Sequence, residues 1–476
     1  MVIPNMTALE LSQAIHTKSL SCREVSLAFL KQIEAHNGAS NAIVSLAPAE
    51  FVLSQADQKD AQLARGESMG WLHGIPQAVK DLVEVAGFPT RHGSPLTETL
   101  PATTDNLMVA RMRAAGCIFL GKTNTPEFGL GSHTFNEVFG ATRNAWDPSK
   151  SAGGSSGGAA VALAQRMLPV ADGSDFMGSL RNPAAWNHVF GMRPSQGRLP
   201  RYPVADGFIA QLSTEGPMAR TVRDLAMLLS TQAGYDARSP LTIAESGQTF
   251  TQSLDAAMKH RRIGWLGNLH AYLPMEDGIL SVCESALKTL ETTGCDVSAA
   301  QLGMSPEEIW EAWLVWRKAL SGRNIGTYTH HPNWRNKVKP EAQWEYDQSL
   351  SLTGSQLMQA SVTRTRYYQS MLKLFESFDV LVLPSAQVWP FDVTERWPQS
   401  INGQAMDTYH RWMEVVIYAT FAGLPAISVP AGFNAQGLPM GLQLIGKPQG
   451  DFELLQVAYA YEQAAQELMQ KRPPGI

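Results

Sequence analysis

The chain opens with two amphipathic segments, each of which begins with a helix-capping pattern. Thr7 precedes Glu10 and Ser21 precedes Glu24 by three residues, the spacing at which a hydroxyl and a carboxylate cap a helix start reciprocally. Apolar residues follow each pair at positions that share one helical face. The pattern predicts two helices within residues 7–36.

Beyond these two helices, short apolar runs alternate with longer helical patterns. The runs predict strands over residues 77–85, 117–123, 167–171, 263–266, 380–384, 426–430 and 441–446. The helical patterns cover residues 49–65, 105–115, 158–165, 219–233, 281–293, 304–376 and 452–469. This alternation predicts an α/β fold whose core is a single large mixed β-sheet covered by helices on both faces.

Composition and charge exclude several classes of function. The chain has 476 residues, a formal net charge of −5, and no basic excess that would attract nucleic acid or an anionic membrane. It shows neither a secretory signal pattern nor an apolar run of about 18 residues. Its four cysteines form no C-x-x-C pair, so no zinc or redox site is predicted. We expect a cytoplasmic protein with no nucleic-acid or membrane partner.

One lysine lies inside an apolar run. Lys80 follows Ala78 and Val79 in the strand predicted over 77–85. A buried lysine is unfavourable unless it is paired or gives up its proton. Two interpretations remain: Lys80 is a neutral base in a closed site, or it stands on an edge strand and its amine reaches water.

A segment rich in glycine and serine, residues 151–158, runs directly into a predicted helix. Backbone N–H groups and hydroxyls at a helix N-terminus can hold a reacting or anionic group. The segment lacks the G-K-[ST] ending of a phosphate-binding loop. Its other interpretation is a flexible loop.

A second turn rich in glycine and serine, residues 173–183, contains Ser174 and Ser179. A serine that follows successive backbone amides in a tight turn can attack a carbonyl while the amides hold the oxyanion. The other interpretation is an ordinary surface turn.

A nucleophilic serine needs a base, because a free hydroxyl is scarcely ionised near pH 7. None of the eleven histidines lies in a distinctive motif, and His188, the nearest to the second turn, sits among packing residues. Lys80 is the alternative, since burial can lower a lysine pKa from about 10.4 to roughly 7–8.

These segments together resemble the amidase signature family. The resemblance rests on Gly74-Ile75-Pro76-x-x-x-Lys80-Asp81, on Gly153-Gly154-Ser155-Ser156-Gly157-Gly158, and on Gly173-Ser174-Asp175-x-x-Gly178-Ser179-Leu180-Arg181-x-Pro183. Residues 423–430 and 437–446 are also similar to the family. The resemblance covers most of the chain and is weakest over 235–375.

The resemblance implies a Ser-Ser-Lys triad that hydrolyses an amide through an acyl-enzyme, with no metal or organic cofactor. Ser179 would be the nucleophile, and Ser155, entered through a cis peptide bond from Gly154, would pass its proton to a neutral Lys80. The backbone N–H groups implied to hold the oxyanion are those of Phe176, Met177, Gly178 and Ser179. The residues implied to support the site are Ser156, Asp175 and Arg181.

The resemblance also implies one amidase signature domain over residues 1–476. Its parts would be an N-terminal helical segment (1–66), a catalytic signature core (67–235), a variable, partly helical segment (236–376) and the C-terminal part of the α/β core (377–476). Three positions depart from the family pattern: Met177 replaces a usual Gly, Gln77 an often apolar residue and Ala152 a common Pro. Backbone amides do not depend on the side chain, so we expect the oxyanion turn to survive.

The candidate substrate-binding residues are Ser132, His133, Phe135 and Met177, with others expected from residues 236–420. Eight tryptophans lie beyond residue 300, and aromatic side chains suit an apolar or aryl substrate, although the spacing of Trp310 and Trp313 is also typical of a core. We expect a small apolar or aryl amide. A carbamate or an ester would present the same carbonyl.

Other functions remain open. Gly153-x-Ser155-x-Gly157 fits the nucleophile elbow of α/β-hydrolases, but no strong strand precedes it. A glutaminase subunit of a tRNA-dependent amidotransferase would depend on a partner chain, and a scaffold would keep the fold without the chemistry. Homodimers are common among similar proteins, and the sequence leaves the oligomeric state open.

Overall fold

Three helices lead into the sheets: α1 (Ala8–His16), α2 (Cys22–Ser40) and α3 (Ala49–Ala64). The computed structural model describes residues 2–476. Both capping boxes form, because the hydroxyls of Thr7 and Ser21 accept the N–H groups of Glu10 and Glu24 at 3.1 and 3.0 Å. The two helices predicted within residues 7–36 are therefore confirmed.

A three-stranded sheet carries Lys80 at the end of its edge strand. Its order is β1 (Ile43–Val44), β3 (Ile118–Thr123) and β2 (Pro76–Lys80). Strands β2 and β3 run parallel, and α4 (Leu107–Ala114) lies between them in the sequence. Every residue of β2 is buried, so the apolar run reflects a strand that is covered on both sides.

An eight-stranded sheet forms the main core. Across the sheet the strands are β4 (Val170–Asp175), β6 (Thr214–Ala219), β5 (Phe190–Arg193), β12 (Ala426–Phe433), β13 (Pro439–Gly446), β9 (Val380–Pro384), β7 (Arg262–Trp265) and β8 (Asp296–Ala299). Strand β7 runs parallel to β8 and β9, and the other neighbours are antiparallel. The sheet is therefore mixed, and the predicted α/β class is confirmed.

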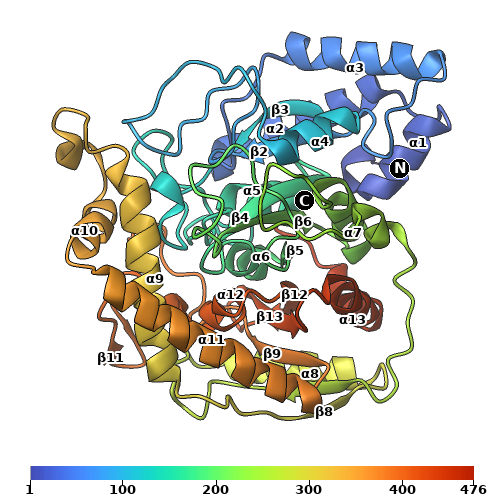
Figure 1. The fold of residues 1–476 in the computed structure, drawn as a ribbon. Coiled ribbons are helices and arrows are strands. Elements are labelled where there is room, and N and C mark those ends of the chain that lie inside the picture. The colour runs from blue at the N-terminus through green and yellow to red at the C-terminus, as the bar shows by residue number, and fades with distance from the viewer. Residues whose placement is uncertain (1) are drawn as a thin grey trace.

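The remaining helices cover this sheet and extend from it. They are α5 (Gly157–Ala164), α6 (Arg181–Asn187), α7 (Val222–Gln232), α8 (Ile279–Glu291), α9 (Pro306–Gly326), α10 (Pro340–Ser349), α11 (Gly354–Ser377), α12 (Ile417–Phe421), α13 (Asp451–Ala464) and α14 (Gln466–Met469). A two-stranded ribbon pairs β10 (Ser400–Ile401) with β11 (Gln404–Ala405). Figure 1 shows α9, α10 and α11 gathered on one side of the molecule, away from α1 and α3. No helix within residues 2–476 is long and apolar enough to cross a membrane.

The division into two sheets falls between β2 and β4, where the sequence pattern predicts a single sheet. The two strands lie side by side, but the Asp172 carboxylate accepts the backbone N–H of Lys80 at 3.2 Å. A side-chain oxygen thus takes the N–H that a carbonyl of a neighbouring strand would otherwise accept. The same carboxylate accepts a hydrogen bond from Gln77 Nε2 at 3.4 Å.

The two strands that lead into the serine and lysine site, β2 and β4, differ most from their predicted bounds. Strand β2 ends at Lys80 rather than at residue 85, because the chain turns there and the N–H of Leu82 bonds to the Lys80 carbonyl at 2.8 Å. Strand β4 extends to Asp175 and pairs with β6 along its length. Residues 173–175, predicted as part of a turn, are therefore strand, and the turn begins at Phe176.

Candidate active site

Three serine hydroxyls lie within hydrogen-bond distance of the Lys80 amine. Its Nζ atom is 2.8 Å from Ser155 Oγ, 2.9 Å from Ser156 Oγ and 3.0 Å from Ser174 Oγ. The side chain of Lys80 is fully buried, so the alternative in which its amine reaches water is wrong. Three segments far apart in the sequence supply these four residues.

Burial controls the charge of this amine. Desolvation lowers the pKa of Lys80 to about 7, although the nearby carboxylates of Asp172 and Asp175 favour the charged form. The neutral form of Lys80 is therefore accessible near pH 7, unlike that of an ordinary lysine. A neutral amine can accept a proton from one hydroxyl while it donates to others.

The segment at residues 151–158 is a closely packed turn and not a flexible loop. The peptide bond between Gly154 and Ser155 is cis, and helix α5 begins at Gly157. A Cβ at Gly158 would lie 2.5 Å from the carbonyl oxygen of Ala42 and nearer still to the backbone nitrogen of Asn124. The glycines therefore let the helix start pack directly on neighbouring backbone and hold Ser155 beside Lys80.

A buried carboxylate shapes the turn that carries Ser179. Asp175, the last residue of β4, accepts the N–H groups of Gly178 and Leu180 at 2.9 and 3.2 Å. It also pairs with Arg181 at 3.0 Å. Burial alone raises the pKa of Asp175, but the charges of Arg181 and Arg193 and these hydrogen bonds hold it at about 2. The carboxylate thus stays ionised and fixes both ends of the turn.

The backbone N–H groups of this turn differ in what they can bind. Gly178 is committed to the Asp175 carboxylate, so the geometry does not leave its N–H free for an oxyanion. The N–H groups of Phe176, Met177 and Ser179 donate no hydrogen bond to another group within residues 2–476. These three amides remain available to a carbonyl oxygen placed at the turn.

Ser179, the predicted nucleophile, is nearly buried, with 6% of its surface exposed. Its carbonyl accepts the N–H of Ser156 at 3.2 Å, which holds the two serine segments side by side. No hydrogen bond joins Ser155 Oγ to Ser179 Oγ, and no histidine bonds to Ser179, within residues 2–476. Catalytic hydrogen bonds are often loose before substrate binds.

Sequence reasoning missed two neighbours of Lys80. Ser174 stands in the glycine-serine motif without an assigned role, although its hydroxyl and its carbonyl both face the amine at 3.0 and 3.4 Å. Asp172 lies two residues earlier on β4, and burial raises its pKa to about 6 even though Lys80 and Lys122 lower it. The alternation of side chains along a strand, with 172 and 174 on one face, could have indicated both.

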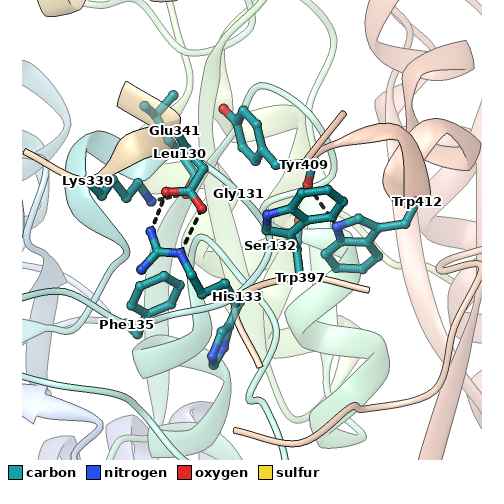
Figure 2. A pocket seen from close by; sticks show the side chains of 11 residues that line it. Leu130, Gly131, Ser132, His133, Phe135, Lys339, Glu341, Trp397, Tyr409 and Trp412 are labelled. Carbon is teal, nitrogen blue, oxygen red and sulfur yellow. Dashed lines mark hydrogen bonds and ion pairs between the residues drawn. The ribbon is translucent and has the colours of Figure 1, made fainter. Parts of the chain in front are cut away.

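Three of the four predicted substrate-binding residues line one narrow cavity. Figure 2 shows Ser132, His133 and Phe135 on its wall, facing side chains from the variable segment and the C-terminal part. The cavity has a volume of about 10 Å³, room for about one water molecule. The other lining residues are Leu130, Gly131, Lys339, Glu341, Arg396, Trp397, Tyr409 and Trp412.

His133 uses both ring nitrogens within the protein. Nε2 lies 3.0 Å from the Val393 carbonyl, and Nδ1 lies 2.7 Å from Ser151 Oγ. Because a carbonyl can only accept, Nε2 carries the proton and Nδ1 accepts from the Ser151 hydroxyl. Burial lowers the pKa of His133 to about 4. The ring therefore lines the cavity as a neutral wall. Ser132 Oγ, in contrast, has no hydrogen-bond partner within residues 2–476.

Met177, the fourth predicted residue, does not line the cavity. Its sulfur accepts a hydrogen bond from Arg317 Nη1 at 3.4 Å. Arg317 lies on α9 and is bound by Glu345 and Tyr409, at 2.8 and 2.6 Å. The residues that surround the turn from the variable segment could not be named from the sequence.

No group of three or more His, Cys, Asp or Glu side chains within residues 2–476 is arranged to hold a metal ion. All four cysteines are unpaired and buried. The site around Lys80 presents a buried amine, serine hydroxyls and backbone amides.

Known proteins resemble this chain over nearly its whole length. A family model described as Amidase matches residues 24–455. An acylamidase from Rhodococcus erythropolis is 33% identical over 461 residues, which cover 96% of this chain and 95% of that protein. One of the subunits of glutamyl-tRNA(Gln) amidotransferase from Coxiella burnetii is 32% identical over 479 residues, with 96% and 97% covered.

The fold gives the same result. The crystal structure of a bacterial aryl acylamidase, described as one of the amidase signature enzymes, matches with a TM-score of 0.90 and 28% identity. The match covers 98% of this chain and 99% of that one. Since family model, sequence and fold agree over nearly the whole length, the chain belongs to the amidase signature family of amide-hydrolysing enzymes.

Proposed function

We propose that this enzyme cleaves the C–N bond of a small, uncharged apolar or aryl amide through an acyl-enzyme on Ser179. Lys80 is the base and Ser155 carries the proton between them. The observation that carries the proposal is the fully buried Lys80 amine, 2.8 Å from Ser155 Oγ and with its pKa lowered to about 7. A base whose pKa lies near 7 suits proton transfer from a serine hydroxyl.

The reaction follows from these groups in two halves. Ser179 Oγ bonds to the amide carbon as its proton passes to Ser155, while the Ser155 proton passes to Lys80 Nζ. The amides of Phe176, Met177 and Ser179 hold the oxyanion. The same relay then returns a proton to the leaving nitrogen as the C–N bond breaks. Water attacks the acyl carbon and gives a proton to the relay, which returns a proton to Ser179 Oγ as the bond between Oγ and the acyl carbon breaks and the acid leaves.

The surroundings of the turn support an uncharged substrate. Phe176 packs against Trp313 with ring centroids 5.3 Å apart, which places aromatic surface beside the oxyanion turn. The buried cation that contacts the Met177 side chain, Arg317, is already neutralised by Glu345 at 2.6 Å. An acyl group that carries its own charge would therefore gain no unpaired partner from Arg317. Similarity to an acylamidase and to an aryl acylamidase adds support for this class.

A second candidate is glutamine hydrolysis as part of an amidotransferase. It is favoured by the 32% identity to a glutamyl-tRNA(Gln) amidotransferase chain over 96% of this protein. Glutamine differs from an apolar amide because it carries an ammonium and a carboxylate, which both need charged partners when buried. Carbamates and esters are further candidates, since they present the same carbonyl to Ser179.

Labelling and a substrate panel test the proposal together. A serine-directed fluorophosphonate should label wild type at one residue, and Ser179→Ala should remove the label with the fold intact by circular dichroism. The isolated chain should turn over acyl anilides much faster than glutamine. A label that persists in Ser179→Ala would overturn Ser179 as the nucleophile. Glutamine turnover that appears only with a partner chain would overturn the small apolar or aryl amide as the substrate.

Two matched variants test the relay. Both Ser155 and Ser174 place a hydroxyl within 3.0 Å of Lys80 Nζ, but only Ser155 lies between Lys80 and Ser179 in the proposed path. Ser155→Ala should lower kcat by about 10²–10⁴, the usual contribution of general acid–base catalysis. Ser174→Ala should lower it far less. Equal losses would contradict the path through Ser155.

A further inference from the structure

Helix α9 of the variable segment reaches the oxyanion turn through one buried guanidinium. Arg317 Nη1 donates to Met177 Sδ at 3.4 Å, and the Arg317 guanidinium carbon lies 5.6 Å from the centre of the Phe176 ring. Phe176 also packs on Trp313, one helical turn earlier on α9. The side chains of both residues whose amides open the turn therefore rest on this helix.

Arg317 is itself held rigidly. Its Nε atom donates to Glu345 Oε1 at 2.8 Å and Nη2 donates to the Tyr409 hydroxyl at 2.6 Å. Tyr409 in turn donates to the same Glu345 oxygen at 2.6 Å. Arg317 and Glu345 are 2% and 0% exposed. The planar guanidinium presents donors in fixed directions, so three of its nitrogens have fixed partners.

Met177 is the residue that makes such a support necessary. The family resemblance leads to Gly at this position, which has no side chain to place. Methionine has three rotatable side-chain bonds and adapts to its surroundings, so an unsupported Met177 side chain would let the turn shift. The sulfur is instead fixed by Arg317, and Met177 is 3% exposed.

We propose that Arg317 is a positioning residue for the oxyanion turn and acts through Met177. The proposal rests on the proposed function, in which the amides of Phe176, Met177 and Ser179 hold the developing oxyanion. Arg317 makes no hydrogen bond to Ser179 or Lys80 within residues 2–476. Its part is to keep the amide of residue 177 aimed at the carbonyl oxygen, and Glu345 and Tyr409 keep Arg317 in place.

A double-mutant cycle tests this coupling. Arg317→Met should lower kcat about 10–100-fold, somewhat below the 10²–10³ for loss of a whole oxyanion donor, and should change KM little. In a Met177→Gly background the same Arg317→Met change should alter kcat less than threefold relative to Met177→Gly alone. Independent sites would give equal losses of kcat in the two backgrounds, so this difference would show that Arg317 and Met177 are coupled. Equal losses in both backgrounds would overturn the proposal.

Controls separate positioning from folding. Arg317→Met leaves Glu345 buried without its cation, so Arg317→Met combined with Glu345→Gln restores charge balance and should show the same loss of kcat. Arg364 also contacts α9, with its guanidinium 5.3 Å from the Trp316 ring, but it donates to the Phe421 carbonyl and to Gln196 and makes no hydrogen bond to Met177 within residues 2–476. Arg364→Met should leave kcat within about twofold. A comparable loss in Arg364→Met would show a general effect of α9 and overturn the proposal.

Labelling distinguishes this proposal from the proposed function. If fluorophosphonate does not label Ser179 in wild type, the proposed function fails, and the role of Arg317 that rests on it fails as well. If Ser179 is labelled and Arg317→Met keeps full kcat, only the role of Arg317 is wrong. A transition-state mimic such as a trifluoromethyl ketone should lose affinity in Arg317→Met in proportion to kcat, whereas a substrate-like competitive inhibitor should not.

Discussion

The carboxylate of Asp172 accepts the backbone N–H of Lys80 at 3.2 Å, so a buried acid on one strand lies against the residue that carries the buried amine on the next. Burial of Lys80 lowers its pKa to about 7, and the negative charge of Asp172 is the largest influence that raises it. The balance between these two effects sets the pH at which the amine becomes neutral.

The rate of acylation should therefore rise with pH through about 7, because the neutral form of Lys80 is the active one. Asp172→Asn removes the charge that favours the protonated amine, so the rising limb should move to lower pH. The measurement is kcat/KM from pH 5 to 10. Asp224→Asn, which alters a buried carboxylate that accepts the N–H groups of Ala8 and Leu9, should leave the limb in place. A flat profile in wild type would exclude Lys80 as the base.

Replacing Lys80 should make the protein more stable near neutral pH. The native pKa of Lys80 is about 7 against 10.5 for the ordinary amine, so the unfolded chain binds more protons between these values. Native stability due to Lys80 is therefore lowest at and below pH 7 and recovers as pH rises to 10.5. The free energy of unfolding of Lys80→Met should therefore exceed that of wild type by more at pH 7 than at pH 10. The difference between the two pH values should be up to about 3 kcal/mol.

Urea unfolding of both proteins at the two pH values measures this difference. The hydrogen bonds to three serine hydroxyls are lost in Lys80→Met, which reduces the gain at both values by a similar amount. Activity should fall by orders of magnitude at both. A gain that is equal at pH 7 and 10 would mean that Lys80 is not neutralised by burial.

Asp175 should be needed for stability as well as for turnover. Asp175→Asn leaves Arg181 and Arg193 buried without their anion, and removing one partner of a buried pair costs about 3–5 kcal/mol. The turn also loses the charged acceptor of two N–H groups, so kcat should fall. The matched control is Asp236→Asn, because Asp236 pairs with an exposed Arg238 and should change stability by less than about 1 kcal/mol.

Acid should remove the contribution that the Asp175 carboxylate makes to stability. The pKa of Asp175 is lowered from 3.8 to about 2 by Arg181 and Arg193 against the effect of burial. Its contribution to stability is fully present above pH 4 and is lost as pH falls through 2. Wild type should therefore lose more stability than Asp175→Asn between pH 4 and 2, which acid titration followed by circular dichroism can measure.

The parts of the site that the sequence predicts are those that local pattern encodes. Lys80 stands out because an amine interrupts an apolar run, and the serine segments stand out because glycine and serine cluster at a helix start. The partners of these residues come from far away in the chain: 94 residues separate Lys80 from Ser174, and 140 separate Met177 from Arg317. A single sequence carries no local signal for such contacts.

The fold also has parts that follow from local sequence pattern and parts that depend on contacts between distant residues. Helices with capping boxes and apolar strands follow from short-range pattern, and most of them lie where predicted. The separation of the three-stranded sheet does not, because at this boundary the side chain of Asp172, and not a backbone carbonyl of β4, accepts the Lys80 N–H. The bounds of β2 and β4 differ for a related reason: their ends are set by what they pair with and not by their own composition.

The glycine at position 158 should be required for the fold of the serine segment. A Cβ there would lie 2.5 Å from the Ala42 carbonyl oxygen and nearer to the Asn124 nitrogen, and neither is a flexible side chain. Gly158→Ala should therefore destabilise the protein by about 1–3 kcal/mol or more. Since Ser155 lies two residues before this helix, displacement of the helix start should also lower kcat.

Gly354→Ala is the matched control, because a Cβ at Gly354 would meet nothing within 4 Å. It should be neutral or slightly stabilising at the start of α11, and urea unfolding compares the two. A Gly158→Ala protein as stable and active as wild type would show that helix α5 can move away from Asn124, and that close packing at this point does not fix Ser155.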